Sequence, residues 1–555
     1  MTLSGKVHAP RALLRIPATA LTFFFAICFA ACGDYYRPVA QPIEGAQPSP
    51  AAAHTVISIN TDGVANNFSS NGSATNIDVS GDTVQGNVTV GLIPTHAAMT
   101  PDGSKLYVAN SADDTVTANA TSSPATVAGT VSLPASPSAT ITSVTGDGAT
   151  ATYAYTGGTG IVSVGDTVYI TGCATAGFDG VYIVTGASGN SFSVASPTSG
   201  TDNPESPAAL AKTPNAVFVG TADDNNIYVT GYQTNSVYAI STSSNVVNVT
   251  IPVGTHPVAL AQLPNKQQLY VTNQGSGNVS VIDTGTNDTV IQTISLPGGA
   301  VPIWAVAKSD STRAYVLDEN GNIYDINPQT FAFTSVASVG TGADYLAFDP
   351  VLDRLYVTNP SNSQVAILDA SADPPRLLNT INLATAPGGA CVNCAPTSVT
   401  VLGDGSRAYV AAYQFAPGCT DTSGNAVNCV ESLVAVIDGP SSTLKSIISP
   451  VGSGAALSTT GCGAGSGPIP SLWQPGTPRF RVSIASSGGG TNSNFKVFIG
   501  QCDAGSVAVI DTYAANGNPP DVYSGTSLPA PLSTFPGLSL GVPPPENPVF
   551  VVAGP

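Results

Sequence analysis

The stretch Gln268-Leu-Tyr-Val-Thr-Asn273 decides the fold, because variants of it return along the whole chain. Each variant is centred on an aromatic anchor, and the seven anchors are Tyr107, Tyr228, Tyr270, Tyr315, Tyr356, Tyr409 and Phe498. From 228 to 270 to 315 to 356 the spacings are 42, 45 and 41 residues. A unit of this length fits four short antiparallel strands. The sequence therefore predicts an all-β fold of repeated four-stranded sheets.

A second phrase follows the anchor and ends in an acidic residue, as in Val281-Ile-Asp283. The distance from anchor to Asp is 13 residues in three repeats, from 270 to 283, 356 to 369 and 498 to 511. Ile323-Tyr-Asp325 and Val436-Ile-Asp438 are further copies. We expect the repeat-final carboxylates to accept hydrogen bonds from turn amides; these are Asp283, Asp369, Asp438 and Asp511.

Tyr270-Val271-Thr272-Asn273 and Tyr356-Val357-Thr358-Asn359 resemble the YVTN repeats of bacterial β-propellers. The resemblance implies a propeller of seven to eight four-stranded blades over residues 54–135 and 204–555. Seven anchors suggest seven blades. Val56-Ile-Ser-Ile-Asn60 and the segments after it resemble an eighth repeat that lacks its first strand, which Asn547-Pro-Val-Phe-Val-Val-Ala553 could supply. Eight blades are the favoured count, since a closure that joins both chain ends leaves no exposed sheet edge there.

The anchors Tyr107 and Tyr228 are 121 residues apart, about 80 more than one repeat of this class needs. The excess, residues 136–203, alternates strand-like stretches with Gly-centred turns. We expect a small inserted β-barrel or sandwich module. It is either a partner-binding element or a tolerated insertion without a ligand.

The first residues have the composition of an export signal. Lys6, Arg11 and Arg15 precede an apolar run that is too short for a transmembrane helix. Phe29-Ala30-Ala31-Cys32 resembles the lipobox of bacterial lipoproteins, which implies a signal peptide over 1–31 and lipidation of Cys32. Since Gly33 follows, the sorting pattern of such lipoproteins implies the outer membrane. Residues 32–53 are rich in Pro and Ala and are expected to form a tether.

The net charge argues against one class of partner, and the position of the cysteines indicates disulfide bonds. The formal net charge of −18 disfavours binding to nucleic acid. In an exported protein, cysteines confined to loop insertions indicate disulfides. We pair Cys391 with Cys394, Cys419 with Cys429 and Cys462 with Cys502, although six cysteines allow 15 connectivities. Cys391-Val-Asn-Cys394 lacks the His of a haem attachment site and is interpreted as a loop staple. Cys173 has no partner in this pairing. It is either a buried free thiol or evidence that the cysteines pair differently.

Candidate catalytic residues are scarce. Neither a nucleophile elbow nor a phosphate loop is present in the sequence. His96 and His256 precede innermost strands and are expected in equivalent loops around the channel mouth, where they are weak candidates for metal ligands. Two His rarely suffice for zinc. We expect no cofactor.

Two functional hypotheses follow. The first is a lipid-anchored, monomeric cell-envelope propeller that binds or scaffolds an envelope protein or glycan and has no catalytic site. The alternative is a propeller enzyme, lactonase-like or similar to quinoprotein and amine dehydrogenase subunits, with its site at the mouth of the central channel. A purely structural envelope component is a third possibility.

Overall fold

The computed structural model describes residues 55–61, 71–79, 83–121, 126–134, 138–204, 208–213, 215–336, 338–386, 391–420, 424–450, 454–456, 462, 480–487, 496–512, 522–529 and 547–554. The predicted signal peptide, Cys32 and the tether lie outside these residues. Among the described residues, no helix has the length and apolar character needed to span a membrane.

The propeller consists of eight four-stranded antiparallel sheets, which confirms the favoured blade count. From the innermost to the outermost strand, blade 1 contains β40 (Asn547–Ala553), β1 (Thr55–Thr61), β2 (Ser73–Asp78) and β3 (Thr83–Thr89); blade 2 contains β4 (Pro94–Met99), β5 (Lys105–Asn110), β6 (Thr115–Ala120) and β7 (Thr126–Ser132). Blade 3 contains β15 (Ala216–Gly220), β16 (Asn226–Gly231), β17 (Ser236–Ser241) and β18 (Val246–Pro252); blade 4 contains β19 (Pro257–Gln262), β20 (Gln268–Asn273), β21 (Asn278–Asp283) and β22 (Thr289–Ser295).

Blade 5 contains β23 (Pro302–Ala307), β24 (Ala314–Asp318), β25 (Ile323–Ile326) and β26 (Phe333–Val336); blade 6 contains β27 (Tyr345–Asp349), β28 (Arg354–Asn359), β29 (Gln364–Asp369) and β30 (Arg376–Asn382). Blade 7 contains β31 (Ala395–Val401), β32 (Arg407–Thr420), β33 (Ala426–Asp438) and β34 (Thr443–Ile448), with β35 (Ala455–Ala456) paired to β33; blade 8 contains β36 (Val482–Ser486), β37 (Lys496–Gln501), β38 (Ser506–Asp511) and β39 (Val522–Pro529). Short 3₁₀ turns η2 (Pro360–Asn362) and η3 (Leu383–Thr385) border blade 6.

The two chain ends meet in blade 1. β40 pairs antiparallel with β1, so the C-terminal segment supplies the missing first strand as predicted. The innermost strands of successive blades are neighbours, and β36 and β4 both lie against β40, which closes the ring.

The recurring phrase Tyr-Val-Thr-Asn has a structural explanation in blade packing. The anchor Tyr rings are buried between blades, and the Tyr228 hydroxyl donates to Asp288 Oδ1 of the next blade at 2.8 Å. The Asn that ends the phrase is buried as well. Asn273 Nδ2 donates to Asn278 Oδ1 at 2.8 Å and to Ser280 Oγ at 2.9 Å, which fixes the start of the third strand. The phrase therefore reports packing and turn geometry.

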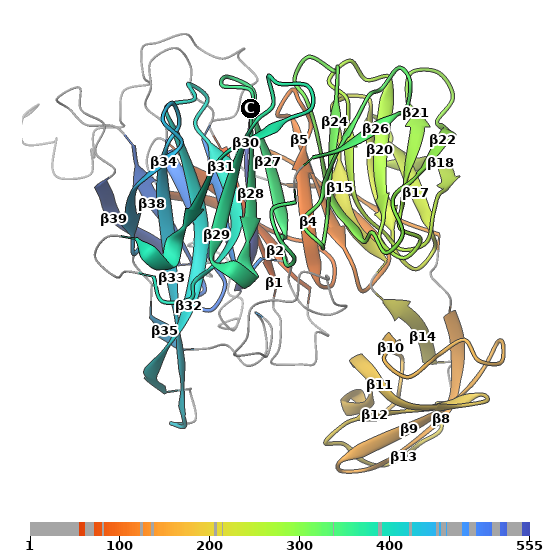
Figure 1. Ribbon diagram of the computed structural model, residues 1–555. Helices are drawn as coiled ribbons and strands as arrows, with labels where there is room; N and C mark the ends of the chain where they lie inside the picture. The colour runs from red at the N-terminus through yellow and green to blue at the C-terminus, as the bar shows by residue number, and fades with distance from the viewer. Residues whose placement is uncertain are drawn as a thin grey trace, which may run out of the picture. The chain divides into compact units, whose positions relative to one another are not determined.

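The propeller strands run between two faces of the molecule (Figure 1). On one face, which we name the turn face, the first strand turns into the second in blades 2 to 8, and the third strand turns into the fourth in every blade. On the opposite face, which we name the loop face, the second strand turns into the third and each blade connects to the next. Antiparallel pairing within every blade requires this alternation.

The repeat-final carboxylates cap turns on the turn face. Asp283 accepts from the amides of Gly285 and Thr286, and Asp369 and Asp438 bind Ser371 and Ser441 in the same way. The prediction is confirmed for these three, and the side chain of Asp511 lies outside the described residues. Asp325 is different, because it pairs with the anchor Tyr315 itself in mid-strand. The corresponding turn in blade 5 is capped by Asn327, whose Oδ1 accepts from the amides of Gln329 and Thr330.

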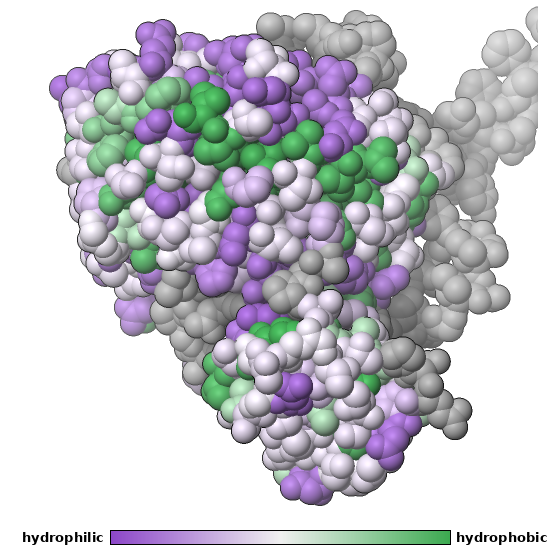
Figure 2. Space-filling view, turned by 90° about the vertical axis from the view of Figure 1, so that its right-hand side faces the viewer, coloured by the Kyte–Doolittle hydropathy of each residue, from purple (hydrophilic) through white to green (hydrophobic). Residues whose placement is uncertain are grey.

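The outermost strands are edges that other strands could pair with. Seven of the eight carry a β-bulge where they pair with the third strand. Bulges twist an edge and disfavour pairing with another chain. On the face drawn in Figure 2, apolar residues (green) form an interrupted band across the upper part of the view. The exposed large apolar residues of the outermost strands are Val127, Val246, Ile291, Leu377 and Leu378.

The inserted module is a closed barrel. Its strands are β8 (Ser138–Asp147), β9 (Thr150–Thr156), β10 (Thr167–Thr171), β11 (Gly180–Ser188), β12 (Ser191–Ala195), β13 (Ser199–Asp202) and β14 (Ala208–Thr213), with η1 (Ala176–Phe178) between β10 and β11. The order β8-β14-β10-β11-β12-β9 closes through a β8–β9 pairing, and β13 adds to β8. The barrel sheet continues to Thr213, beyond the expected end of the module at residue 203. Cys173 is a buried free thiol there, and burial raises its pKa to about 12.

Candidate functional site

The central channel is lined by one equivalent position on each innermost strand. In most blades this position follows a bulge at the start of the strand, as between Pro94 and His96 or between Pro302 and Trp304. The eight residues in this position are His96, Phe218, Ala259, Trp304, Tyr345, Ser398, Ser483 and Phe550.

The structure corrects the expectation that His96 and His256 are equivalent. His96 lies inside β4, whereas His256 immediately precedes β19 with φ of 53°. The residue equivalent to His256 is Ile93, which has φ of 48°. Both strands have the same bulge after their first residue, Pro94 or Pro257, so the Thr-His pattern simply lies three positions later relative to β4 than relative to β19. His96 stacks on Phe218 with a centroid distance of 3.8 Å, and His256 stacks on Tyr232 at 4.3 Å. The two histidines therefore belong to separate aromatic contacts.

Aromatic rings occupy the channel at this level. Trp304 of blade 5 contacts His96 of blade 2 at 6.3 Å and Phe480 of blade 8 at 6.0 Å, so the ring contacts cross the channel axis. Phe550 also lies 4.5 Å from His96. We name this set the central aromatic cluster; its members are His96, Phe218, Trp304, Tyr345, Phe480 and Phe550. Side chains thus fill the place where the alternative hypothesis, a propeller enzyme, would have its site.

Metal-binding groups are not brought together elsewhere in the described parts of the chain. Within those residues, no group of three or more His, Cys, Asp and Glu side chains has a geometry that could hold a metal ion.

A cavity of about 560 Å³ lies between blades 6 and 7 on the loop face. Four segments line it: the turn after β28, the end of β30, the Cys391–Cys394 loop, and β32 where it extends past the blade. The lining residues are Pro360, Ser361, Asn362, Ser363, Asn382, Ala384, Val392, Asn393, Ala395, Tyr413, Gln414 and Phe415. This volume is within the range of small-molecule sites.

Local structure positions each wall of this cavity, which we name the blade 6–7 cavity. Asn359 Oδ1 accepts from the Asn362 amide and shapes the turn, and Asn382 Oδ1 accepts from the Ala384 amide. Gln414 Oε1 accepts from the Val392 amide at 2.6 Å, which ties the loop to β32.

Two of the three predicted disulfides border the cavity or its neighbouring hairpin. Cys391–Cys394 closes the loop that carries Val392 and Asn393, and Cys419–Cys429 joins the extended ends of β32 and β33. All three expected pairs are bonded. The sequence shows both interruptions of the repeat, but as loop insertions they indicate only stapled loops. The available signal for a site was that both interruptions adjoin blade 7, one before its first strand and one between its second and third.

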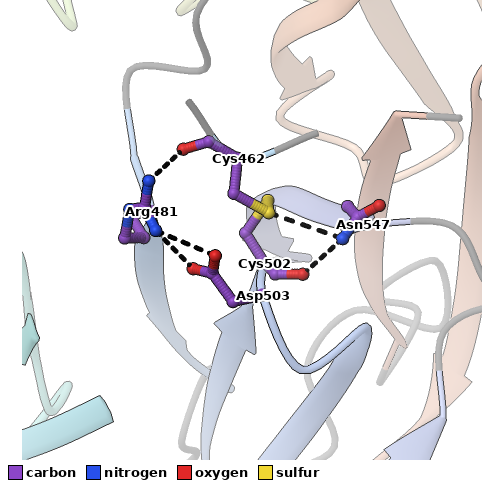
Figure 3. The surroundings of a disulfide bond; sticks show 5 residues. All are labelled: Cys462, Arg481, Cys502, Asp503 and Asn547. Atoms are coloured by element: carbon purple, nitrogen blue, oxygen red, sulfur yellow. Dashed lines mark hydrogen bonds and ion pairs between the residues drawn. A yellow bond between two sulfur atoms is a disulfide. The ribbon is translucent and has the colours of Figure 1, made fainter. Parts of the chain in front are cut away.

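The third disulfide, Cys462–Cys502, stands beside the strand that closes the ring (Figure 3). Arg481 is fully buried and binds both carboxylate oxygens of Asp503, at 2.8 and 3.0 Å. It also donates to the Cys462 carbonyl at 2.9 Å, while Asn547 at the start of β40 donates to the Cys502 carbonyl at 2.7 Å. A buried charge needs such compensation. These contacts hold the Cys462 segment, blade 8 and β40 together.

Comparison with known proteins gives matches of structure only. No protein-family model matches the chain, and no curated protein is similar to it. The hydrazine synthase of Kuenenia stuttgartiensis is 18% identical with a TM-score of 0.39, over 54% of this chain and 77% of its own. A Bacteroides fragilis protein proposed to be a 6-phosphogluconolactonase is 12% identical with a TM-score of 0.42, over 73% of this chain and 97% of its own. A Bacteroides uniformis protein with the same proposed activity is 10% identical with a TM-score of 0.41, over 71% and 97%. Similarity at this level does not indicate an activity for this protein.

Proposed function

We propose that this protein is a lipid-anchored, non-catalytic binding protein of the cell envelope that uses the loop face of its YVTN-type propeller. One observation carries the proposal. The barrel insertion, the three disulfides, the extended β32–β33 hairpin and the blade 6–7 cavity all belong to connections on the loop face. Binding residues concentrate on loops that a rigid scaffold positions.

The central channel supports a binding role over the enzyme alternative. That alternative requires reacting groups at the channel mouth, and the position is occupied by the central aromatic cluster. Trp304 is only 4% exposed and packs between Phe218, Tyr345 and Phe480. A substrate would have to displace these rings, which lose buried apolar area when they move.

Export and anchoring rest on the sequence, where Ala30-Ala31-Cys32 follows a basic and then an apolar segment. The replacement Cys32→Ala removes the thiol that a diacylglycerol would modify. We expect the wild-type protein to fractionate with membranes and to carry a lipid on residue 32 by mass spectrometry, and the variant to lose both. Membrane association that is unchanged in Cys32→Ala would contradict the anchor.

The loop face can be tested by site-specific photo-cross-linking in intact cells. Val392 on the loop face is 68% exposed, and Val351 on the turn face of blade 6 is 51% exposed, which makes them a matched pair. With a photoreactive amino acid at either position, we expect a discrete cross-linked adduct from position 392 alone. Adducts of equal yield from position 351, or none from 392, would argue against the loop face as the binding surface.

A further inference from the structure

The wall of the blade 6–7 cavity is polar and uncharged. Its twelve lining residues include three Asn, one Gln and two Ser but no ionisable group other than the Tyr413 phenol. A charged ligand in this cavity would lose hydration without gaining an opposite charge from the wall. The wall therefore favours a ligand that is polar and neutral.

The cavity has hydrogen-bonding groups to offer such a ligand. Ser361, Asn362 and Asn393 are exposed, and their side chains make no hydrogen bond within the described protein. Asn382 uses its carbonyl oxygen for the Ala384 amide and retains its two N–H donors. A side-chain amide both donates and accepts. This pattern matches vicinal hydroxyl groups, each of which also donates and accepts.

An apolar surface lies in the same wall. Phe415 is half-buried, and its ring is held by Tyr413 at a centroid distance of 5.5 Å and by the Arg481 guanidinium at 5.5 Å. Val392 is the most exposed of the large apolar side chains in the described protein. Fixed rings and aliphatic groups beside amides provide a surface for the C–H groups of a pyranose ring, whose edges carry hydroxyls.

We propose that the blade 6–7 cavity binds a neutral saccharide unit, of one or two sugar rings, in an envelope glycan. The cavity of about 560 Å³ has room for such a unit. This inference rests on the proposed binding function and names its ligand class. Asn362 and Asn393 bind the sugar hydroxyls, and Phe415 with Val392 packs against the ring.

The test uses the full-length protein in detergent and three neutral disaccharides: cellobiose, maltose and N,N′-diacetylchitobiose. Saturation-transfer-difference NMR detects binding, and calorimetry measures affinity. Galacturonic acid and glucosamine serve as charged probes. We expect at least one neutral disaccharide to bind and both charged sugars to bind more weakly or not at all. Absence of binding by all three disaccharides, or equal binding of the charged sugars, would overturn the proposal.

Variants locate the binding to the cavity. Asn393→Gly retains the positive φ of 57° at this position while removing the amide, and Asn362→Ala removes the second amide. Each is expected to weaken binding about tenfold or more. In the complex the sugar hydroxyls exchange water for these amides, so removing an amide leaves a hydroxyl without a hydrogen-bond partner. Asn287→Ala, in an exposed turn-face turn of blade 4, should leave affinity unchanged. Equal affinity of the cavity variants and wild type would overturn the site.

Failure of this inference and failure of the proposed function give different results. A peptide or protein adduct from position 392 with no saccharide binding would overturn the saccharide and keep the binding role of the loop face. Saccharide binding that is lost in Asn393→Gly would support both.

Discussion

The replacement Asp325→Asn tests whether a buried carboxylate makes this propeller less stable as the pH rises. Asp325 lies in the middle of β25 and is 4% exposed. Burial raises its pKa from 3.8 to about 6, and the neighbouring Arg313 opposes this rise. Arg313 Nε lies 3.3 Å from Asp325 Oδ1, but the same guanidinium also pairs with Asp373 on the next blade. One positive charge is thus shared by two carboxylates, which leaves the desolvation of Asp325 incompletely offset.

The sign of the effect follows from proton binding. Between pH 3.8 and about 6 the folded protein holds a proton on Asp325 that the unfolded chain has released. Stability falls with pH wherever the folded state binds more protons. The difference between 3.8 and about 6 corresponds to a loss of about 3 kcal/mol, complete once the pH exceeds the folded-state pKa. Asn has no proton to release, so the variant lacks this loss.

The assay is urea unfolding followed by far-UV circular dichroism, from about pH 4 to about pH 7 at constant ionic strength. Relative to Asp325→Asn, the wild type should lose about 2 kcal/mol of unfolding free energy across this range, because part of the total is already lost at pH 4. Asp369→Asn is the control. Hydrogen bonds from Ser371 lower the pKa of Asp369, so its contribution is lost as the pH falls, which is the opposite sign. A difference between wild type and Asp325→Asn that stays constant, or that grows in favour of wild type as the pH rises, would refute the reasoning.

Three further substitutions test the channel, the blade contacts and the cavity. Trp304→Ala should cost about 3–5 kcal/mol of unfolding free energy by leaving a cavity in the central aromatic cluster, and a thermal melt within error of wild type would show that the rings do not pack there. Tyr228→Phe should cost about 1 kcal/mol because Asp288 loses its hydrogen bond from the preceding blade; a urea midpoint equal to that of wild type would contradict this contact. Replacing both Cys391 and Cys394 by Ser should leave the far-UV spectrum unchanged yet weaken disaccharide binding, measured by calorimetry, because the loop that carries Asn393 is no longer closed; unchanged affinity would show that the disulfide does not shape the cavity.

The repeat made the propeller predictable, because its residues perform the same packing task in each blade. Tyr228 and Asn273 are buried whatever loops follow them, so the phrase remains recognisable. Asp325 shows the limit of this argument. It ends an Ile-Tyr-Asp phrase like the turn-capping carboxylates, yet it pairs with Tyr315 in mid-strand and the turn is capped by Asn327. The phrase alone does not reveal on which residue the strand ends.

The proposed binding region was less predictable, since it depends on contacts between segments that follow no repeat. His96 occupies the channel position that Ala259 occupies in blade 4, and the shared Thr-His pattern suggested a different alignment of the two repeats. The blade 6–7 cavity needs the turn at Asn362, the loop at Asn393 and the extension of β32 to meet. Each of these could be recognised as an irregularity, but their meeting is a property of the folded ring.

Side chains on the turn face join neighbouring blades, whereas the loop face carries the insertions. This difference supports the loop face as the proposed ligand-binding surface. On the turn face, long side chains two residues before several of the anchors reach the next blade: Gln268 donates to the Pro328 carbonyl at 3.1 Å and Arg354 to the Pro440 carbonyl at 2.9 Å. Arg313 does the same through Asp373. These bonds join blade to blade, so a change there costs stability whatever it does to binding. The loop face carries insertions of very different length on the same scaffold, as is usual for loops that a rigid framework positions for binding.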